Sequence, residues 1–459
     1  MSVDLDLLQN KLAALADLGV KKTLAKGAEE AEAFVSYTDI TSINVKTAII
    51  DARQGAPSGI GVRVVVDGKV GFSATSGIDE ARIGQVAEEA VAVAQICPLD
   101  PAFKHLPDPV KRYSRNGIID DRILEFSEKE ALNEVNMLAK GTFERNKRVK
   151  SLWGNVGVWK GAFAVANSRG IASSSKGAFI NAGIYCVAVK DGKQKTGSES
   201  LLSRKLTDFS EVGTKAADRA VKMLEAKPLG KSLKTPTVWE NTAIGYLFWN
   251  MLNTASNARN VQEGKSYFKG KIGEKVASNI VTVVDDGQLP DGLSTQRIDA
   301  EGVPMQTTML IENGVLKTYL YDSYAALREN KKSTGNAKRQ TPSDEPFLTT
   351  PTVFTTNLVA KTGSKNLEEL VAEVDEGVLI TDFVMGVGHA NPITGEFSVV
   401  APSSFFVEKG EIVTPLEPVT VAGNFFHALK KIQAIGCDTR LLEIGKIPSI
   451  IIGDLTVSG

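Results

Sequence analysis

The chain contains only three cysteines in 459 residues, namely Cys97, Cys186 and Cys437. They are odd in number, far apart and in no paired spacing, so the sequence offers neither a disulfide framework nor a thiolate zinc finger. Free cysteines of this kind are typical of proteins kept in a reducing compartment. We therefore expect a cytoplasmic protein without structural disulfides.

Histidine is equally rare, and the three copies are His105, His389 and His427. No two of them are close enough to share a helix face, and the His-Glu-x-x-His zinc motif is missing. His105 lies in a proline-rich linker, and His427 lies between aromatic and basic residues in "GNFFHALKK". For both, a solvated or packed structural role is the simpler interpretation.

His389 lies in a glycine-rich stretch, "MGVGHANPITGEFS", and is the histidine best suited to a binding role. Glycines let a ligand approach the backbone closely, and histidine titrates near neutral pH. We predict that Gly386, Gly388, His389, Thr394 and Gly395 lie near a substrate or partner groove. The alternative is a turn that only closes the fold.

The sequence has almost no net charge, because 53 lysines and arginines face 54 aspartates and glutamates. No global field would therefore attract nucleic acid or an anionic membrane, and we expect neither as a partner. The first residues, "MSVDLDLLQNKLAALADLGVKK", indicate an amphipathic helix and not a signal peptide.

Signatures of cofactor binding and nucleophilic catalysis are also missing. The pair Gly386 and Gly388 lacks the strand, turn and helix context of a dinucleotide fingerprint, and no Gly-x-Ser-x-Gly elbow is present. The residues alone therefore predict no cofactor and make only a weak case for catalysis.

One long segment, residues 241–258, has no charged residue and no histidine: "NTAIGYLFWNMLNTASNA". Asparagines and a serine interrupt it, whereas a membrane span needs about 20 mostly apolar residues. The segment is therefore predicted to be a packed helix in a protein with no membrane partner.

The length exceeds what one hydrophobic core usually organises, which is roughly 250 to 300 residues. We predict three parts: α+β subdomains at 1–110 and 111–230, and a β-rich C-terminal domain at 231–459. The fold class is α+β, with helices packed on an N-terminal antiparallel sheet. Helices are predicted at the N-terminus, at 79–97, from 127 to 139, at 207–226, at 241–258, at 365–375 and at 425–435.

Five dipeptides between β-branched runs predict strand turns, because aspartate, asparagine and glycine tolerate positive φ. They are Asp67-Gly68, Asp191-Gly192, Asp286-Gly287, Asn313-Gly314 and Lys409-Gly410.

Several separated motifs of the second half resemble the TldD/PmbA (TldE) family of peptide-processing proteases. They are, in order, "KIGEKVASNIVTVVDDG", "DAEGVPMQTTMLIENGVLKTYLYD", "STGNAKR", "GHANPITGEFSVVAPSSFFVEKGEIVTP" and "TVAGN". The stretch "GVRVVVDGKVGFSAT" resembles the family's opening hairpin. The resemblance therefore covers most of the chain.

The resemblance implies a two-subunit machine. TldD carries a His-Glu-x-x-x-His helix and a cysteine near its C-terminus that bind catalytic zinc, and PmbA/TldE is its homologue without the metal site. Counting back from "GKSYFKG", the family's His, Glu and His fall on Trp249, Asn250 and Thr254. None of these side chains can bind zinc or take a proton from its water. Cys437 lies upstream of the family's cysteine position.

The chain is thus identified as a PmbA/TldE-like member without the zinc motif. We expect no metal of its own, zinc in a TldD-like partner subunit, and unfolded or modified peptides in extended form as substrates of the pair. Homologous subunits commonly pair through equivalent surfaces, so a homodimer is one arrangement left open for the chain alone. Two alternatives stay open: a stand-alone peptidase with a metal site built from His389, His427, Cys437 and distant acids, and a regulatory binding protein of the gyrase-modulator type.

Overall fold

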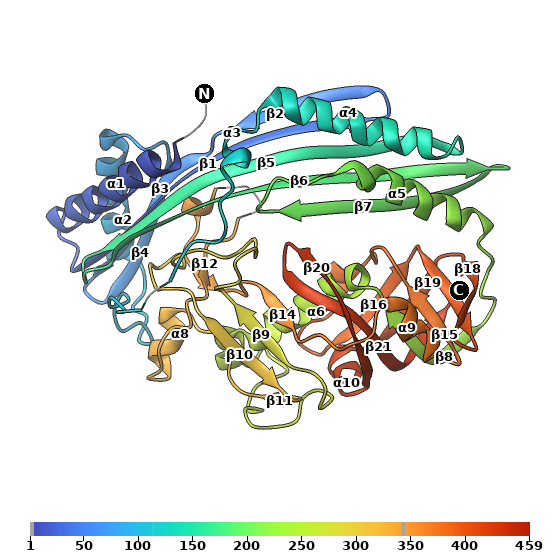
Figure 1. Cartoon of the computed structure of the whole chain (residues 1–459). Coiled ribbons are helices and arrows are strands. Elements are labelled where there is room, and N and C mark those ends of the chain that lie inside the picture. The colour runs from blue at the N-terminus through green and yellow to red at the C-terminus, as the bar shows by residue number, and fades with distance from the viewer. Residues whose placement is uncertain (1–3, 113, 342–344) are drawn as a thin grey trace.

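The computed structural model describes residues 4–112, 114–341 and 345–459, and its two halves are each built on a β-sheet (Figure 1). The N-terminal half forms a seven-stranded antiparallel sheet, here called the long sheet. Its order is β4-β3-β1-β5-β6-β7, and β2 pairs with the second part of β1. The strands are β1 (Glu30–Lys46), β2 (Ile49–Gly55), β3 (Ser58–Val66), β4 (Lys69–Ser76), β5 (Val149–Asn167), β6 (Ala172–Lys190) and β7 (Lys193–Ser203).

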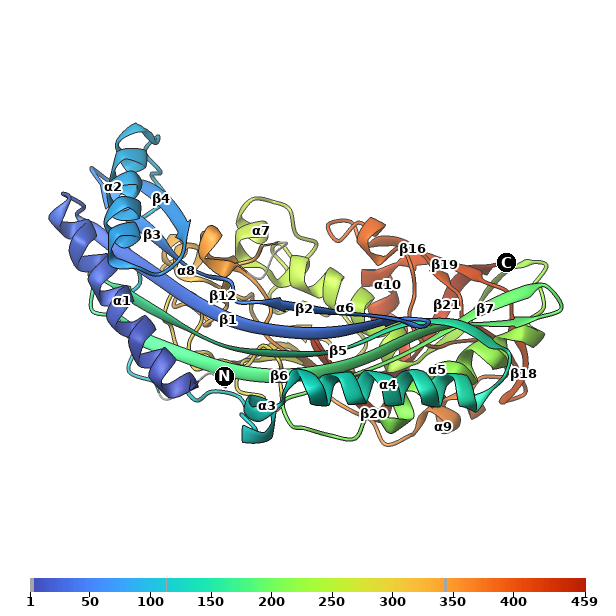
Figure 2. The same cartoon turned by 90° about the horizontal axis from the view of Figure 1, so that it is seen from above.

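Helices cover one face of the long sheet, which we call the outer face (Figures 1 and 2). At one end α1 (Leu5–Ala25) and α2 (Glu80–Ile96) bury an alanine- and valine-rich cluster, and at the other end α4 (Glu128–Arg145) and α5 (Ser210–Lys222) bury a second one. The short elements α3 (Asp121–Glu125) and η1 (Met223–Glu225) lie nearby in sequence. The four helices predicted for this half are confirmed, although α4 runs past the predicted end at 139 to Arg145.

Alternation along the long strands decides which side chains meet the helices. Val156 and Val158 of β5 and Ile180 and Ala182 of β6 are fully or almost fully buried on the outer face. The residues between them point to the opposite face, because successive side chains of a strand alternate. We call this opposite side the inner face, and it is directed toward the C-terminal half of the chain (Figure 1).

The C-terminal half is built on a twelve-stranded mixed sheet with the main order β11-β10-β9-β14-β21-β8-β15-β17-β18. The pairs β14 with β21 and β15 with β8 are parallel, and the other pairs are antiparallel. Its strands are β8 (Ser232–Trp239), β9 (Val283–Asp286), β10 (Thr307–Glu312), β11 (Val315–Leu316), β14 (Leu358–Ala360), β15 (Glu376–Ile380), β16 (Glu396–Ala401), β17 (Ser404–Glu408), β18 (Glu411–Leu416), β19 (Val419–Asn424), β20 (Ile432–Leu442) and β21 (Gly445–Ser458). The strands β12 (Ala337–Lys338) and β13 (Thr352–Val353) form a separate pair.

The helices of this half are short, apart from the uncharged one. They are α6 (Asn241–Ser256), α7 (Ala258–Gln262), α8 (Ser323–Arg328), η2 (Pro346–Leu348), α9 (Leu367–Ala372), η3 (Val387–His389) and α10 (Phe425–Lys430). The predicted extension of a helix to 435 is wrong, because β20 already begins at Ile432. Among the described residues no helix is both long and apolar enough to cross a membrane. The α+β fold class is confirmed.

Four of the five predicted turns are confirmed, with positive φ at both central residues, for example 51° and 68° at Asp67 and Gly68. The prediction at Asp286 and Gly287 is wrong. The partner strand β10 begins only at Thr307, and Gly287 does not adopt positive φ. The Asp286 carboxylate instead accepts hydrogen bonds from the Gln288 N–H and the Thr307 hydroxyl, which directs the chain into a long loop.

A buried group of charges joins the two halves, and we call it the charged clamp. Arg63 of β3 donates to Glu32 of β1 at 2.6 Å and to Glu301 of the C-terminal half at 3.0 Å. Arg339, also of the C-terminal half, donates to Glu32 at 2.8 Å. Burial alone would lower the pKa of Arg63, but the two carboxylates outweigh it and hold the pKa above its usual value. For Arg339 burial dominates and lowers the pKa to about 10.

Candidate functional site

Helix α6 is the uncharged segment singled out in the sequence, and one side of it is a core element. Leu247, Phe248, Met251 and Leu252 are at most 2% exposed. The Phe248 ring packs edge to face on Phe425 of α10, with ring centroids 5.7 Å apart. This side explains the apolar character of the segment without a membrane.

The opposite side of α6, here called the open face, carries Tyr246, Trp249, Asn250, Asn253 and Thr254, none of which is buried. Their spacing of three and four residues places them on one side of the helix. The Trp249 indole N–H donates to the Thr355 hydroxyl at 3.0 Å, and the Asn253 side-chain oxygen accepts from the Thr355 N–H at 3.0 Å. The open face therefore makes specific polar contacts with a neighbouring loop.

The positions predicted to replace a metal motif, Trp249, Asn250 and Thr254, lie on this open face. Zinc binds imidazole, thiolate and carboxylate groups, and its water needs a carboxylate to accept a proton. An indole N–H only donates, and the Asn250 amide donates to the Val387 carbonyl at 3.3 Å. A threonine hydroxyl is not among the usual ligands. These residues do not fit a zinc ion.

The hydrogen bond from Asn250 to Val387 also places the predicted glycine-rich stretch. Val387 is the first residue of η3, so Gly386, Gly388 and His389 lie next to the open face of α6. Gly386 adopts a φ of 93°, which glycine tolerates best, and His389 is exposed. The structure thus brings together two sets of residues that the sequence treated separately.

Thr394 and Gly395, the other residues predicted for the groove, lie against α10. The Asn424 amide donates to the Thr394 carbonyl at 2.8 Å, and the Phe425 N–H donates to the Gly395 carbonyl at 2.7 Å. A Cβ at Gly395, whose φ is 89°, would approach the Phe426 ring to 2.5 Å. This contact gives Gly395 a packing reason that the sequence did not reveal.

The remaining residues considered as metal ligands are scattered. His427 is exposed on α10, Cys437 is exposed on β20, and His105 is partly exposed with Nδ1 2.7 Å from the Leu106 carbonyl oxygen. Within the described ranges, no group of three or more histidine, cysteine, aspartate or glutamate residues is placed to hold a metal ion.

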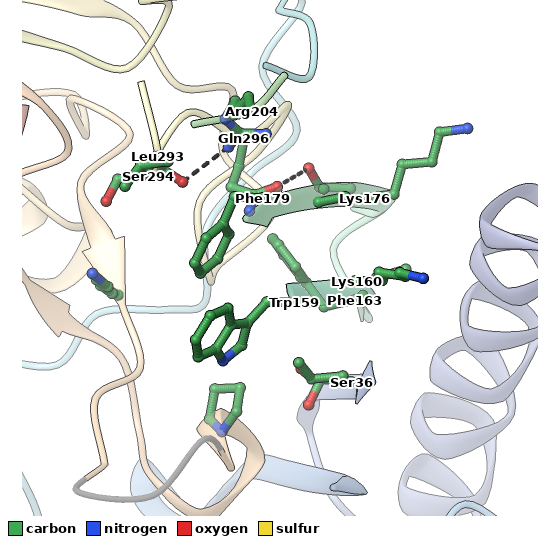
Figure 3. Close-up of a pocket in the computed structure, with 18 of the residues that line it drawn as sticks. Ser36, Trp159, Lys160, Phe163, Lys176, Phe179, Arg204, Leu293, Ser294 and Gln296 are labelled. Carbon is green, nitrogen blue, oxygen red and sulfur yellow. Dashed lines mark hydrogen bonds between the residues drawn. The ribbon is translucent and has the colours of Figure 1, made fainter. Parts of the chain in front are cut away.

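A cavity of about 630 Å³ lies between the inner face of the long sheet and the C-terminal half (Figure 3). Strands β1, β5 and β6 form one side, and the segments 293–296 and 338–341 contribute to the other. Trp159 and Phe179 are opposite each other on β5 and β6 and stack with centroids 5.0 Å apart and planes at 6°. They form an aromatic wall of the cavity (Figure 3).

The cavity exists because side chains are missing from the sheet beside that wall. Gly161 and Gly177 are the next opposed pair on the inner face of β5 and β6, and both line the cavity. A Cβ at Gly161 would approach the Tyr37 carbonyl oxygen to 2.7 Å. At Gly177 the nearest atom would be Arg204 Nη1 at 3.4 Å, which is ordinary contact. Gly177 therefore leaves space that a side chain is able to fill.

Lys338 connects the cavity to the open face of α6. It lines the cavity, and its ammonium group lies 4.8 Å from the centroid of the Phe354 ring. The other neighbour of Phe354 is Trp249, with centroids 5.6 Å apart. Sequence reasoning missed Trp159, Phe179 and Lys338 as site residues. Only Lys338 had a signal, because it belongs to the motif "STGNAKR".

Comparison with protein families agrees with this architecture over nearly the whole chain. Three models of the PmbA/TldA metallopeptidase match: domain 1 at residues 31–94, the central domain at 121–224 and the C-terminal domain at 232–459. An uncharacterised protein of Methanocaldococcus jannaschii is 32% identical over 407 residues, which cover 88% of this chain and 91% of the relative. A metalloprotease TldD homologue of Haemophilus influenzae is 26% identical, covering 84% of this chain and 80% of that protein.

Solved structures show the same fold. A Thermotoga maritima protein described as a proposed modulator of a DNA gyrase superposes with a TM-score of 0.87 at 28% identity, covering 97% of this chain and 99% of that chain. TldE from Thermococcus kodakarensis also gives a TM-score of 0.87, at 24% identity, covering 98% of this chain and all of that one. The fold and the matches define a metallopeptidase-type protein. The chain belongs to the PmbA/TldD family.

Proposed function

We propose that this chain is the metal-free subunit of a PmbA/TldD-type metallopeptidase complex in the cytoplasm. A TldD-like partner would supply the zinc and its activated water, and this chain would help to enclose and hold extended peptides. The pair would process unfolded or modified peptides.

The observation that carries the proposal is the chemistry of the open face of α6. The residues at the family's metal positions are Trp249, Asn250 and Thr254, and the first two already donate to groups of the same chain. The side chains of Trp249 and Asn250 thus make hydrogen bonds within the chain, where the family's motif has metal ligands. The metalloprotease names of the relatives support the peptidase side of the proposal.

Strand β2 supports the role in holding extended peptides. It pairs with β1 on one side, whereas no ladder of the described residues uses its other edge. All but the last of its residues are exposed, including Ile49 at 70%. An extended peptide can add to such an edge through main-chain hydrogen bonds, independently of its sequence.

The proposal is tested by mixing the purified chain with a TldD-like protein and following both complex formation and hydrolysis of an unfolded peptide. We expect a stable complex and peptidase activity that requires both chains. If no complex forms and the partner is equally active alone, the proposed function is wrong.

Within this assay, His389→Ala tests the residue beside the open face, and His427→Ala is the matched control because His427 is exposed on α10. We expect His389→Ala to lower the activity of the complex by about tenfold or less, as for a binding contact, and His427→Ala to leave it unchanged. Equal activity of the two variants would show that His389 does not take part in binding and that its segment only closes the fold.

A further inference from the structure

We propose that the cavity between the long sheet and the C-terminal half is a binding subsite for the carboxyl-terminal residue of a peptide. A large apolar side chain of that residue would lie against the Trp159–Phe179 wall, and its carboxylate would pair with Lys338. The choice of a peptide as ligand rests on the proposed function. Binding itself is a property of this chain alone.

The apolar part of the site follows from the sheet. Trp159 and Phe179 stand as a stacked pair above a floor that lacks side chains at Gly161 and Gly177. A side chain placed on this floor would contact the aromatic rings and lose its exposure to water, which is the main source of affinity for apolar groups. A cavity of about 630 Å³ has room for a large side chain and its backbone.

The charged part of the site is Lys338. Within the described part of the chain its ammonium group has no hydrogen bond and no carboxylate within 4 Å, although it lies over the Phe354 ring. Burial lowers the pKa of Lys338, and the charges of Glu443, which also lines the cavity, and of Asp285 oppose this shift without cancelling it. An incoming carboxylate would supply the missing counter-charge.

The other cations that line the cavity are already engaged. Arg204 donates to the carbonyl oxygens of Gly292, Leu293 and Thr295, at 2.7 to 2.9 Å. Arg339 belongs to the charged clamp, and Lys160 donates to main-chain carbonyls on the outer side of the sheet. Lys176 pairs with Asp6. A carboxylate in the cavity would therefore be directed to Lys338.

A third feature matches the peptide N–H. The side-chain oxygen of Asn181, which lines the cavity, is buried and accepts no hydrogen bond from the described residues. A buried acceptor without a donor is costly, so a ligand N–H that met this oxygen after a turn of the Asn181 side chain would be stabilising. A carboxyl-terminal residue combines an apolar side chain, a carboxylate and an N–H in one unit. An internal peptide residue lacks the charge.

The test measures binding of fluorescein-labelled tetrapeptides to the full chain by fluorescence anisotropy. Three probes differ only at the last residue: phenylalanine with a free carboxylate, phenylalanine amide, and glycine with a free carboxylate. We expect the phenylalanine acid to bind about tenfold or more tightly than each of the other two, as for loss of a charged hydrogen bond or of a buried ring. Equal binding of acid and amide, or no binding of the acid, would overturn the inference.

Two variants locate the site. Lys338→Met should remove the preference for acid over amide and keep the preference for phenylalanine over glycine. The control Lys332→Met, which changes an exposed lysine nearby in sequence, should alter neither preference. Gly177→Val should fill the floor and weaken binding of both phenylalanine probes. A retained acid preference in Lys338→Met would contradict the assignment even if Gly177→Val failed to fold. Because no partner is present, these outcomes are independent of complex formation.

Discussion

The inner face of the long sheet meets the C-terminal half in two different ways. At the charged clamp, Glu32 and Arg63 of the sheet are closed over by Glu301 and Arg339, and all four side chains are at most 7% exposed. At the cavity, Trp159, Phe179 and the glycine pair face open space. The inner face of the sheet is thus packed closely against the C-terminal half at the clamp and lines an open cavity elsewhere.

This difference suggests that the clamp contributes mainly to the stability of the fold and the cavity mainly to ligand binding. A buried charge is costly unless each partner is paired, so the clamp fixes how the halves sit against each other. Among the cavity residues, Trp159, Phe179 and the glycine pair carry no charge and take no part in the clamp, so they are free to serve a ligand. Breaking the clamp should cost stability, whereas altering the cavity should cost binding.

The largest expected effect is that of Glu32→Gln. This change removes the carboxylate that accepts hydrogen bonds from both Arg63 and Arg339, and it leaves two buried guanidinium groups with a single negative partner. Breaking a buried ion pair from one side usually costs about 3–5 kcal/mol. Urea unfolding should show this loss.

The matched control for the clamp is Glu88→Gln, which breaks the exposed pair of Glu88 with Lys26. Its unfolding curve should coincide with that of the unmodified chain, because solvent screens exposed pairs. If Glu32→Gln also left the curve unchanged, the clamp would not hold the halves together.

Two neighbours on β6 give the next largest contrast. Ile180 is fully buried on the outer face, and Ile180→Ala should cost about 2–5 kcal/mol of unfolding free energy. Phe179 points into the cavity, and Phe179→Ala should cost only about 1 kcal/mol, the loss of its stacking on Trp159. Binding of the phenylalanine acid probe should show the reverse order. Equal losses of stability in the two variants would contradict the division between the faces.

A smaller effect should appear in the pH dependence of stability. Burial raises the pKa of Asp285, in the C-terminal half, from 3.8 to about 7. The folded chain therefore keeps a proton that the unfolded chain releases, so this contribution to stability is complete below pH 3.8 and is lost as the pH rises through about 7.

Asp285→Asn isolates this contribution, because the amide does not titrate. The unfolding free energy of the unmodified chain minus that of the variant should fall as the pH rises from about 4 to about 7 and should then level off. A flat difference over this range would show that the carboxyl group of Asp285 titrates normally.

Most elements could be predicted from local patterns. The capping box of Ser127 and Glu130 and the side-chain cap of Asp79 mark helix starts that the sequence displays openly. Four dipeptide turns were equally readable, because positive φ restricts the choice of residue. The fifth, at Asp286, failed because its side chain bonds to Thr307, a partner 21 residues away.

The site was readable only in part. The helix at 241–258 followed from its uncharged composition, and the positions Trp249, Asn250 and Thr254 followed from the family resemblance. The glycine-rich stretch around His389 followed from its composition. Neither pattern revealed that Asn250 contacts Val387, because that contact depends on tertiary packing. The cavity had no local signal, since Gly161 and Gly177 meet only through the register of β5 and β6.

The most direct test of the proposed function is the metal content of the chain purified alone, measured together with peptidase activity in the absence and presence of a TldD-like partner. The account predicts no bound zinc and activity only in the mixture. Stoichiometric zinc with activity of the isolated chain would contradict it, and would require ligands other than the residues of the open face of α6.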